Sequence, residues 1–183
     1  MNKLLVATAL LTLSSLSLNA FGDDKNAMKP PAPPKEIADM GKSMSGTWKC
    51  KGSAFTPDGK KADMTGTMKS ALEMNNMWIH DTFDATFAGA PFHFESYVTY
   101  DSAGKHFHRI MAESDGGLAE GEGHMNGTTK LDYELDSHGP HGDGKFKDHI
   151  DWSDMKAGVK AAGEMSMDKG KTWVKVYEMT CSK

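Results

Sequence analysis

The sequence predicts an all-β protein, a single up-and-down antiparallel β-barrel of about ten strands that follows a short helix. Apolar and polar residues alternate from residue 46 onward, a period of two that is typical of strands with one buried face. Nine short segments rich in Gly, Asn or Pro interrupt the alternation and predict turns, nearly all of hairpin length. Hairpins join neighbouring antiparallel strands, so ten strands in sequential order follow.

An open ten-strand meander has two edge strands whose outer backbone N–H and C=O groups are unpaired. Closure into a barrel removes both edges, which favours a closed, single-domain β-barrel. An open two-sheet sandwich is the alternative, because the same hairpins also build sandwiches. The predicted turns lie at residues 57–60, 75–76, 88–91, 102–104, 115–117, 126–127, 138–144, 156–158 and 168–170.

The N-terminal segment has the layout of a secretory signal peptide over residues 1–20. Lys3 precedes an apolar run over residues 4–11, and the small residue Ala20 lies at the expected cleavage point. An uncleaved membrane anchor is disfavoured because the run is short and interrupted by Ser and Thr. We therefore predict a periplasmic or secreted protein without stable membrane insertion.

Between the signal peptide and the barrel the sequence predicts a linker and a helix. Residues 21–35 are charged and proline-rich, which favours an extended linker. A short helix is expected over residues 35–41, after Pro34 and ending at Gly41. The β-barrel domain then comprises residues 36–183.

The two cysteines, Cys50 and Cys181, lie in the first and last predicted strands. Export exposes such a pair to oxidising conditions, and a closed barrel makes these strands neighbours. A disulfide is therefore predicted, with two reduced buried thiols as the alternative. A bond closing so long a loop stabilises by about 4 kcal/mol in the chain-entropy description.

Short motifs also carry a resemblance to a known family. Gly46-Thr47-Trp48 follows the predicted helix, and Tyr100-Asp101-Ser102-Ala103-Gly104-Lys105 lies between two strands. Together with the meander, this order resembles the bacterial family called domain of unknown function 1579, over roughly residues 35–181. The resemblance implies a lipocalin-like or calycin-like barrel. It implies no established activity, so no catalytic residue is assigned.

Four charged residues lie in phase with the apolar face of their strands, so we expect Asp81, Arg109, Asp148 and Lys175 to point into the lumen. A buried charge without a partner is costly, so these groups should pair with each other, with water or with a ligand. Arg109 is the only arginine in the chain. Its planar guanidinium suits a carboxylate or phosphate group.

This pattern predicts a barrel that binds a small acidic or amphiphilic hydrophobic ligand. We expect its head group at Arg109, with Lys175, Asp81, Asp148 and Tyr177 nearby; its tail would contact Phe83, Phe94, Met68 and Trp152. The alternative is a structural or interaction module with a filled interior. A cavity of about 300 Å³ or more would favour the ligand.

Other function classes have weaker support. The acidic charge balance, 21 basic against 25 acidic side chains, gives no reason to expect a nucleic-acid partner. Zinc or copper binding by surface histidines is a further alternative, with His106 and His108 on one strand and His138 and His141 in a loop beside Asp136 and Asp143.

An enzyme is the other alternative. Asp81 and Asp148 suit an acid and base pair, but the chain contains no catalytic motif. We predict neither an enzyme nor a cofactor.

Overall fold

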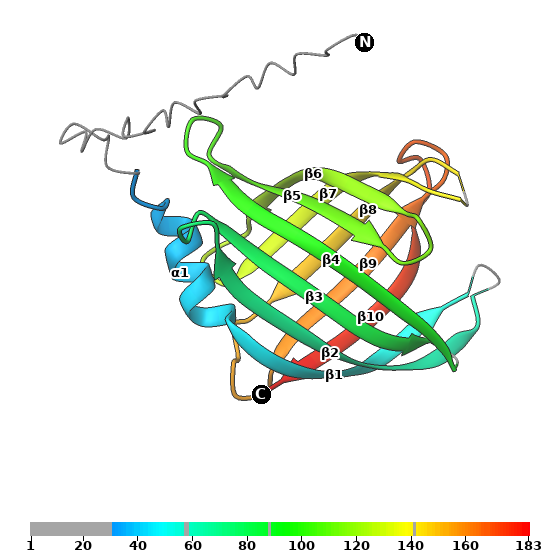
Figure 1. The fold of residues 1–183 in the computed structure, drawn as a ribbon. Coiled ribbons are helices and arrows are strands. Elements are labelled where there is room, and N and C mark those ends of the chain that lie inside the picture. The colour runs from blue at the N-terminus through cyan, green and yellow to red at the C-terminus, as the bar shows by residue number, and fades with distance from the viewer. Residues whose placement is uncertain (1–30, 57–58, 88, 141) are drawn as a thin grey trace, which may run out of the picture. The chain divides into compact units, whose positions relative to one another are not determined.

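Ten strands follow a short helix in the computed structural model, which describes residues 31–56, 59–87, 89–140 and 142–183 (Figure 1). The predicted signal peptide lies outside the described residues, as does the predicted linker up to residue 30. Residues 32–183 form one compact unit. The strands are β1 (Gly46–Phe55), β2 (Lys61–Glu73), β3 (Trp78–Phe87), β4 (Ala90–Asp101), β5 (His106–Glu113), β6 (Leu118–Met125), β7 (Lys130–His138), β8 (Gly144–Asp151), β9 (Val159–Ser166) and β10 (Val174–Ser182).

The strands close into a barrel. Each strand pairs with its neighbours in sequence, and β1 pairs with β10, so the closed antiparallel meander is confirmed and the open sandwich is not found. All nine connections fall at the predicted turns. Cys50 lies directly opposite Cys181 across the β1–β10 seam, and the two form the predicted disulfide. The bond thus closes the barrel at the one place where neighbouring strands are far apart in sequence.

The helix α1 (Lys35–Met44) extends three residues beyond the predicted end at Gly41. Gly41 is a buried position inside the helix, where a Cβ atom would lie 2.5 Å from a side-chain carbon of Leu72. The glycine therefore permits close approach of the helix to β2 and does not end it. Ile37 of the same helix is fully buried.

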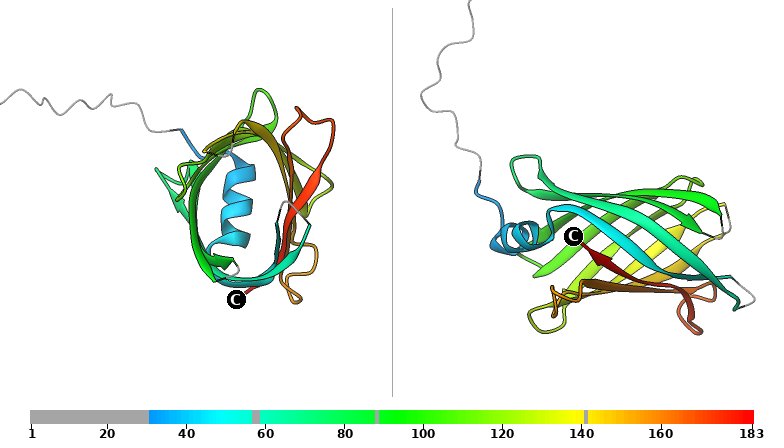
Figure 2. Two further views of the ribbon diagram at one scale, coloured as in Figure 1. Left: turned by 90° about the vertical axis from the view of Figure 1, so that its right-hand side faces the viewer. Right: turned by 90° about the horizontal axis from the view of Figure 1, so that it is seen from below.

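The helix lies across one mouth of the barrel (Figure 2). The loops β2–β3, β4–β5, β6–β7 and β8–β9 lie at this end because successive hairpins alternate between the two ends. The indole Nε1 of Trp48 donates a 2.7 Å hydrogen bond to the Met44 carbonyl, which ties the helix end to β1. One mouth of the lumen is therefore covered by the chain itself.

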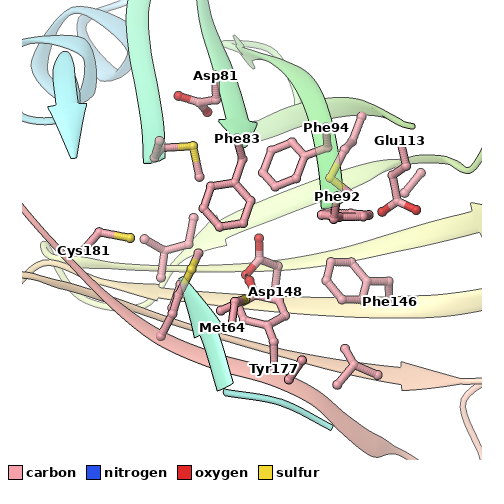
Figure 3. A pocket seen from close by; sticks show the side chains of 18 of the residues that line it. Met64, Asp81, Phe83, Phe92, Phe94, Glu113, Phe146, Asp148, Tyr177 and Cys181 are labelled. Atoms are coloured by element: carbon pink, nitrogen blue, oxygen red, sulfur yellow. The ribbon is translucent and has the colours of Figure 1, made fainter. Parts of the chain in front are cut away.

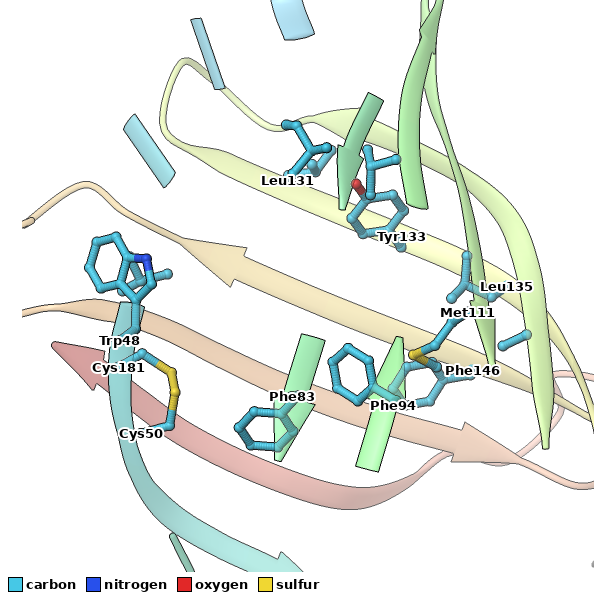
Figure 4. Close-up of a cluster of buried hydrophobic side chains, with 14 of the residues drawn as sticks. Trp48, Cys50, Phe83, Phe94, Met111, Leu131, Tyr133, Leu135, Phe146 and Cys181 are labelled. Carbon is cyan, nitrogen blue, oxygen red and sulfur yellow. A yellow bond between two sulfur atoms is a disulfide. The ribbon is translucent and has the colours of Figure 1, made fainter. Parts of the chain in front are cut away.

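Inward-facing side chains of the strands form the core that surrounds the lumen (Figure 4). The alternation within strands is regular, as in β7, where Leu131, Tyr133 and Leu135 are buried and the residues between them are more exposed. This is the period of two expected of a half-buried antiparallel strand. Aromatic rings gather toward the middle of the barrel, where Phe83 and Phe94 lie 5.3 Å apart between ring centroids.

Candidate functional site

The interior of the barrel contains a cavity of about 380 Å³. Its walls are mostly apolar, and phenylalanines and methionines supply much of the surface (Figure 3). The cavity extends from Met44 at the end of α1 to Phe87 and Glu113, the last residues of β3 and β5 at the opposite end. Because its volume exceeds the value of about 300 Å³ that favours a ligand, the described side chains do not fill the lumen.

A second, smaller cavity of about 40 Å³ lies toward α1. Met40 and Met44 of the helix line it together with Trp152. Asp81, Arg109 and Ser70 line both cavities, so these polar groups lie at the junction between them.

Arg109 and Asp148 form a buried ion pair near the middle of the lumen. Nη1 of Arg109 donates to Oδ2 of Asp148 at 2.5 Å, and the two residues are only 5% and 4% exposed. Burial alone would lower the pKa of Arg109, but Asp148, together with smaller contributions from Tyr133, Asp81 and Tyr177, outweighs burial and holds that pKa above its ordinary value. The sequence placed both charges in the lumen, and pairing was one of the three expected outcomes.

Tyr177 donates its hydroxyl to Oδ1 of Asp148. We call Arg109, Asp148 and Tyr177, with the neighbouring Asp81, the polar centre. Burial, together with the negative charge it bonds to, raises the pKa of Tyr177 well above its usual value, so the hydroxyl keeps its proton. The guanidinium of Arg109 lies 5.7 Å from the ring centroid of Phe94 and 5.4 Å from that of Tyr133, within range of cation–π attraction. The arginine charge is thus compensated by one carboxylate and two aromatic faces.

Asp81 lies in β3 between two buried serines. Ser70 of β2 and Ser96 of β4 are its direct cross-strand partners. Burial raises the pKa of Asp81, while the two hydroxyls and the charge of Arg109 oppose the rise. Within the described residues, neither serine Oγ makes a hydrogen bond of regular geometry, and Arg109 Nε is likewise unpartnered. The Nε of Arg109 therefore retains a free donor at this end, and the serine oxygens can still accept hydrogen bonds.

Lys175 does not face the lumen, which corrects the sequence-based expectation. Its side chain is 47% exposed, and Nζ lies 3.1 Å from Glu178 on the outer surface. The pairing of β10 with β9 shifts between Lys175 and Tyr177, so the extra residue Val176 reverses the inward and outward faces. Val176 and Tyr177 both line the cavity as a result.

The remaining predicted contacts divide between the two cavities. Phe83, Phe94 and Met68 line the main cavity, as expected of residues around an apolar tail. Trp152 lines the small cavity toward α1 instead. The sequence analysis did not single out Ser70, Ser96 or Glu113, although the two serines lie in phase with buried neighbours on their strands. Glu113 was hidden because it ends its strand, where alternation gives little information.

Six of the described histidines, His106 and His138 among them, lie beside carboxylates, and no such pair is found for His108. His138 lies 2.9 Å from Asp143, and His106 lies 3.5 Å from Glu122. His141 lies outside the described residues. In the part of the chain that the structure describes, no three His, Cys, Asp or Glu side chains are arranged to hold a metal ion. Among these residues, no helix is long and apolar enough to cross a membrane.

The family model described as protein of unknown function (DUF1579) matches residues 33–183. The chain belongs to this family. The match confirms the resemblance expected from the motifs around Trp48 and Tyr100. A comparison with curated proteins finds no match to the DUF1579 chain.

Solved structures similar to this DUF1579 protein are also barrels. Rv2717c from M. tuberculosis aligns with a TM-score of 0.57 and 11% identity, over 82% of this chain and 98% of that one. A de novo designed fluorescence-activating β-barrel gives a TM-score of 0.42 and 19% identity, over 60% and 93% of the two chains. A redesigned β-barrel, mFAP0 bound to DFHBI, gives 0.40 and 13%, over 77% and 99%. At these identities the likeness to Rv2717c shows the fold alone.

Proposed function

We propose that this protein binds a small, mainly apolar ligand with one polar end inside the barrel. The observation that carries the proposal is the lumen of about 380 Å³, an apolar cavity with a few convergent polar groups. Small-molecule sites in proteins have this composition, in cavities of about 300–1,000 Å³. The apolar part of the ligand lies against Phe83, Phe94 and Met68, and its polar end lies near Arg109, Asp148, Tyr177 and Asp81.

The polar centre favours an amphiphilic ligand over an acidic one. An acidic head group at Arg109 would compete with Asp148, which already accepts a 2.5 Å hydrogen bond from the guanidinium. Displacing Asp148 would leave a carboxylate buried without its cation, at a cost of about 3–5 kcal/mol. The ligand therefore meets a polar centre whose arginine is already neutralised.

We place this lipocalin-like barrel in the periplasm or outside the cell, after removal of a signal peptide over residues 1–20. The disulfide between Cys50 and Cys181 supports this location because such bonds persist in oxidising compartments. Mass spectrometry of the protein from its native host tests it. A mature N-terminus near residue 21 is expected, and an intact Met1 would contradict the proposal.

Binding is tested with a neutral apolar fluorophore, N-phenyl-1-naphthylamine, whose emission rises in an apolar site. We expect saturable binding at one site per barrel. Ala119→Phe fills the lumen from β6, where Ala119 is 2% exposed and lines the cavity, and should abolish binding. Ala112→Phe is the matched control because Ala112 is exposed on the neighbouring strand β5. No binding, or equal binding by both variants, would contradict a ligand site in the lumen.

A further inference from the structure

We propose that the ligand is a hydrophobic amine whose ammonium group pairs with the Asp81 carboxylate at the junction of the two cavities. This inference rests on the proposed function, because it names the chemical class of the ligand held in the lumen. It is carried by three features of the described residues: the charge balance of the cavity wall, the lack of a cation at Asp81, and the space beside it.

The charged groups that line the main cavity are unequal in number. Arg109 is the one positive side chain among the lining residues, against the three acids Asp81, Glu113 and Asp148. Asp148 already compensates Arg109 at 2.5 Å. The groups left over are carboxyls, so an anionic ligand would add to an excess of negative charge while a cation would relieve it.

Asp81 and Glu113 are the two cavity carboxyls without an ion pair among the described residues, and of the two only Asp81 lies at the junction of the two cavities. Within the described residues, no nitrogen of Lys, Arg or His lies within 4.0 Å of its carboxylate oxygens, whereas Asp148 has Arg109. A buried carboxylate gains most from a partner that arrives with a positive charge and hydrogen-bond donors. An ammonium group supplies one charge and three donors.

The surroundings of Asp81 fit a small cationic group. The cavity of about 40 Å³ beside it exceeds the roughly 10–15 Å³ that is needed to hold one water, which leaves room for an ammonium group. Ser70 and Ser96 flank the carboxylate, and their hydroxyl oxygens can accept hydrogen bonds from an ammonium group. Phe83, two residues along β3, begins the apolar wall, as Figure 3 shows for Asp81 and the phenylalanines.

A series of probes that share one tail tests the proposal. The compounds 4-phenylbutylamine, 4-phenylbutan-1-ol and 4-phenylbutyrate compete for the lumen against N-phenyl-1-naphthylamine, and each inhibition constant is measured at pH 7. We expect the amine to bind about tenfold more tightly than the alcohol, and the carboxylate to bind least well. Asp81→Asn should reduce the amine to the level of the alcohol and leave the alcohol unchanged.

Two further variants keep the result specific. Asp84→Asn is the matched control, because Asp84 lies on the same strand with a side chain 63% exposed and paired with His93 outside the barrel. It should preserve the preference for the amine. If Glu113→Gln removes the preference and Asp81→Asn does not, the assignment to Asp81 is overturned.

The outcomes also separate this inference from the proposed function. If the fluorophore binds and the carboxylate competes as well as the amine, the lumen binds ligands but the amine assignment is wrong. If the fluorophore and all three probes fail to bind, the proposed function itself fails. Unchanged binding of the alcohol and an unchanged far-ultraviolet circular dichroism spectrum show that Asp81→Asn is folded.

Discussion

Two carboxyl groups inside the barrel and two on its outer surface have pKa values that are shifted in opposite directions. Burial raises the pKa of Asp81 and of Glu113, both of which line the cavity. Outside, Thr172 donates backbone and side-chain hydrogen bonds to Asp168 and, with Ser166, lowers its pKa to about 2. Hydrogen bonds from Ser153 likewise hold the pKa of Asp151 at about 2.

The difference shows that the surroundings of a carboxyl group, and not its side-chain chemistry alone, determine the direction of its pKa shift in this fold. On the surface, water and nearby donors favour the charged form, and the turns that contain these donors are stabilised by it. In the lumen, loss of water disfavours the charged form unless a cation is present. Asp148 has such a cation in Arg109. Asp81 makes no ion pair within the described residues, so a ligand can still supply one.

The largest effect is expected from breaking the interior ion pair. Arg109→Met leaves Asp148 buried without its cation and should destabilise the fold by about 3–5 kcal/mol. The matched exterior change is Lys61→Met, which removes a pair with Glu178 at 3.3 Å between exposed side chains and should have a much smaller effect. Urea unfolding at pH 7 measures both. Equal losses would show that burial does not distinguish the two regions.

A smaller effect is expected from the hydroxyl that supports this pair. Tyr177→Phe keeps the ring and removes the hydrogen bond to Asp148, with an expected loss of about 1.5–3 kcal/mol in unfolding free energy. Tyr97→Phe is the exterior counterpart, since Tyr97 stacks on His80 at 4.4 Å between ring centroids and keeps that contact. Its unfolding free energy should not change measurably. A similar loss in both variants would argue that the ring substitution itself is destabilising.

The smallest expected effects are changes in melting temperature. They should have opposite signs for a carboxyl in the lumen and one on the surface, and they should depend on pH. The folded-state pKa of Asp81 is raised, so its stabilising contribution is present below pH about 4 and is lost as the pH rises through the raised pKa. Asp81→Asn should therefore raise the melting temperature at pH 7, by an amount that shrinks toward pH 3.

For Asp168 the sign is reversed. Its contribution is present above pH about 4 and is lost as the pH falls through its folded-state pKa of about 2. Asp168→Asn should lower the melting temperature at pH 7 and cease to matter near pH 2. Thermal unfolding followed by circular dichroism at pH 7, 4 and 2.5 checks both variants. Shifts of the same sign at pH 7 would contradict the contrast between lumen and surface.

The fold was predictable from the sequence because its signals are local. Alternation, turn residues and the position of Cys50 and Cys181 are enough to predict ten strands, their order and the closing disulfide. The end of α1 was predicted wrongly because a glycine that ends a helix and one that permits close packing look alike in sequence. Only the proximity of Leu72 distinguishes the two roles of Gly41.

The site was predictable only in part, because strand register determines which side chains meet inside the barrel. Period two placed Asp81, Arg109 and Asp148 in the lumen, but Arg109 and Asp148 are 39 residues apart and nothing local shows that they meet. Lys175 was misplaced because the irregularity at Val176 has no clear sequence signal, and one extra residue reverses the face of every residue before it.

The disulfide at the seam also changes what a break in the chain would do. Cys50 and Cys181 are 131 residues apart, so the bond makes almost the entire barrel part of one covalent ring. Cleavage of one peptide bond in any of its hairpins would open that ring without releasing a fragment. The same geometry suits circular permutation: β1 and β10 are already adjacent, so new termini in a hairpin such as 126–129 would preserve every strand pairing.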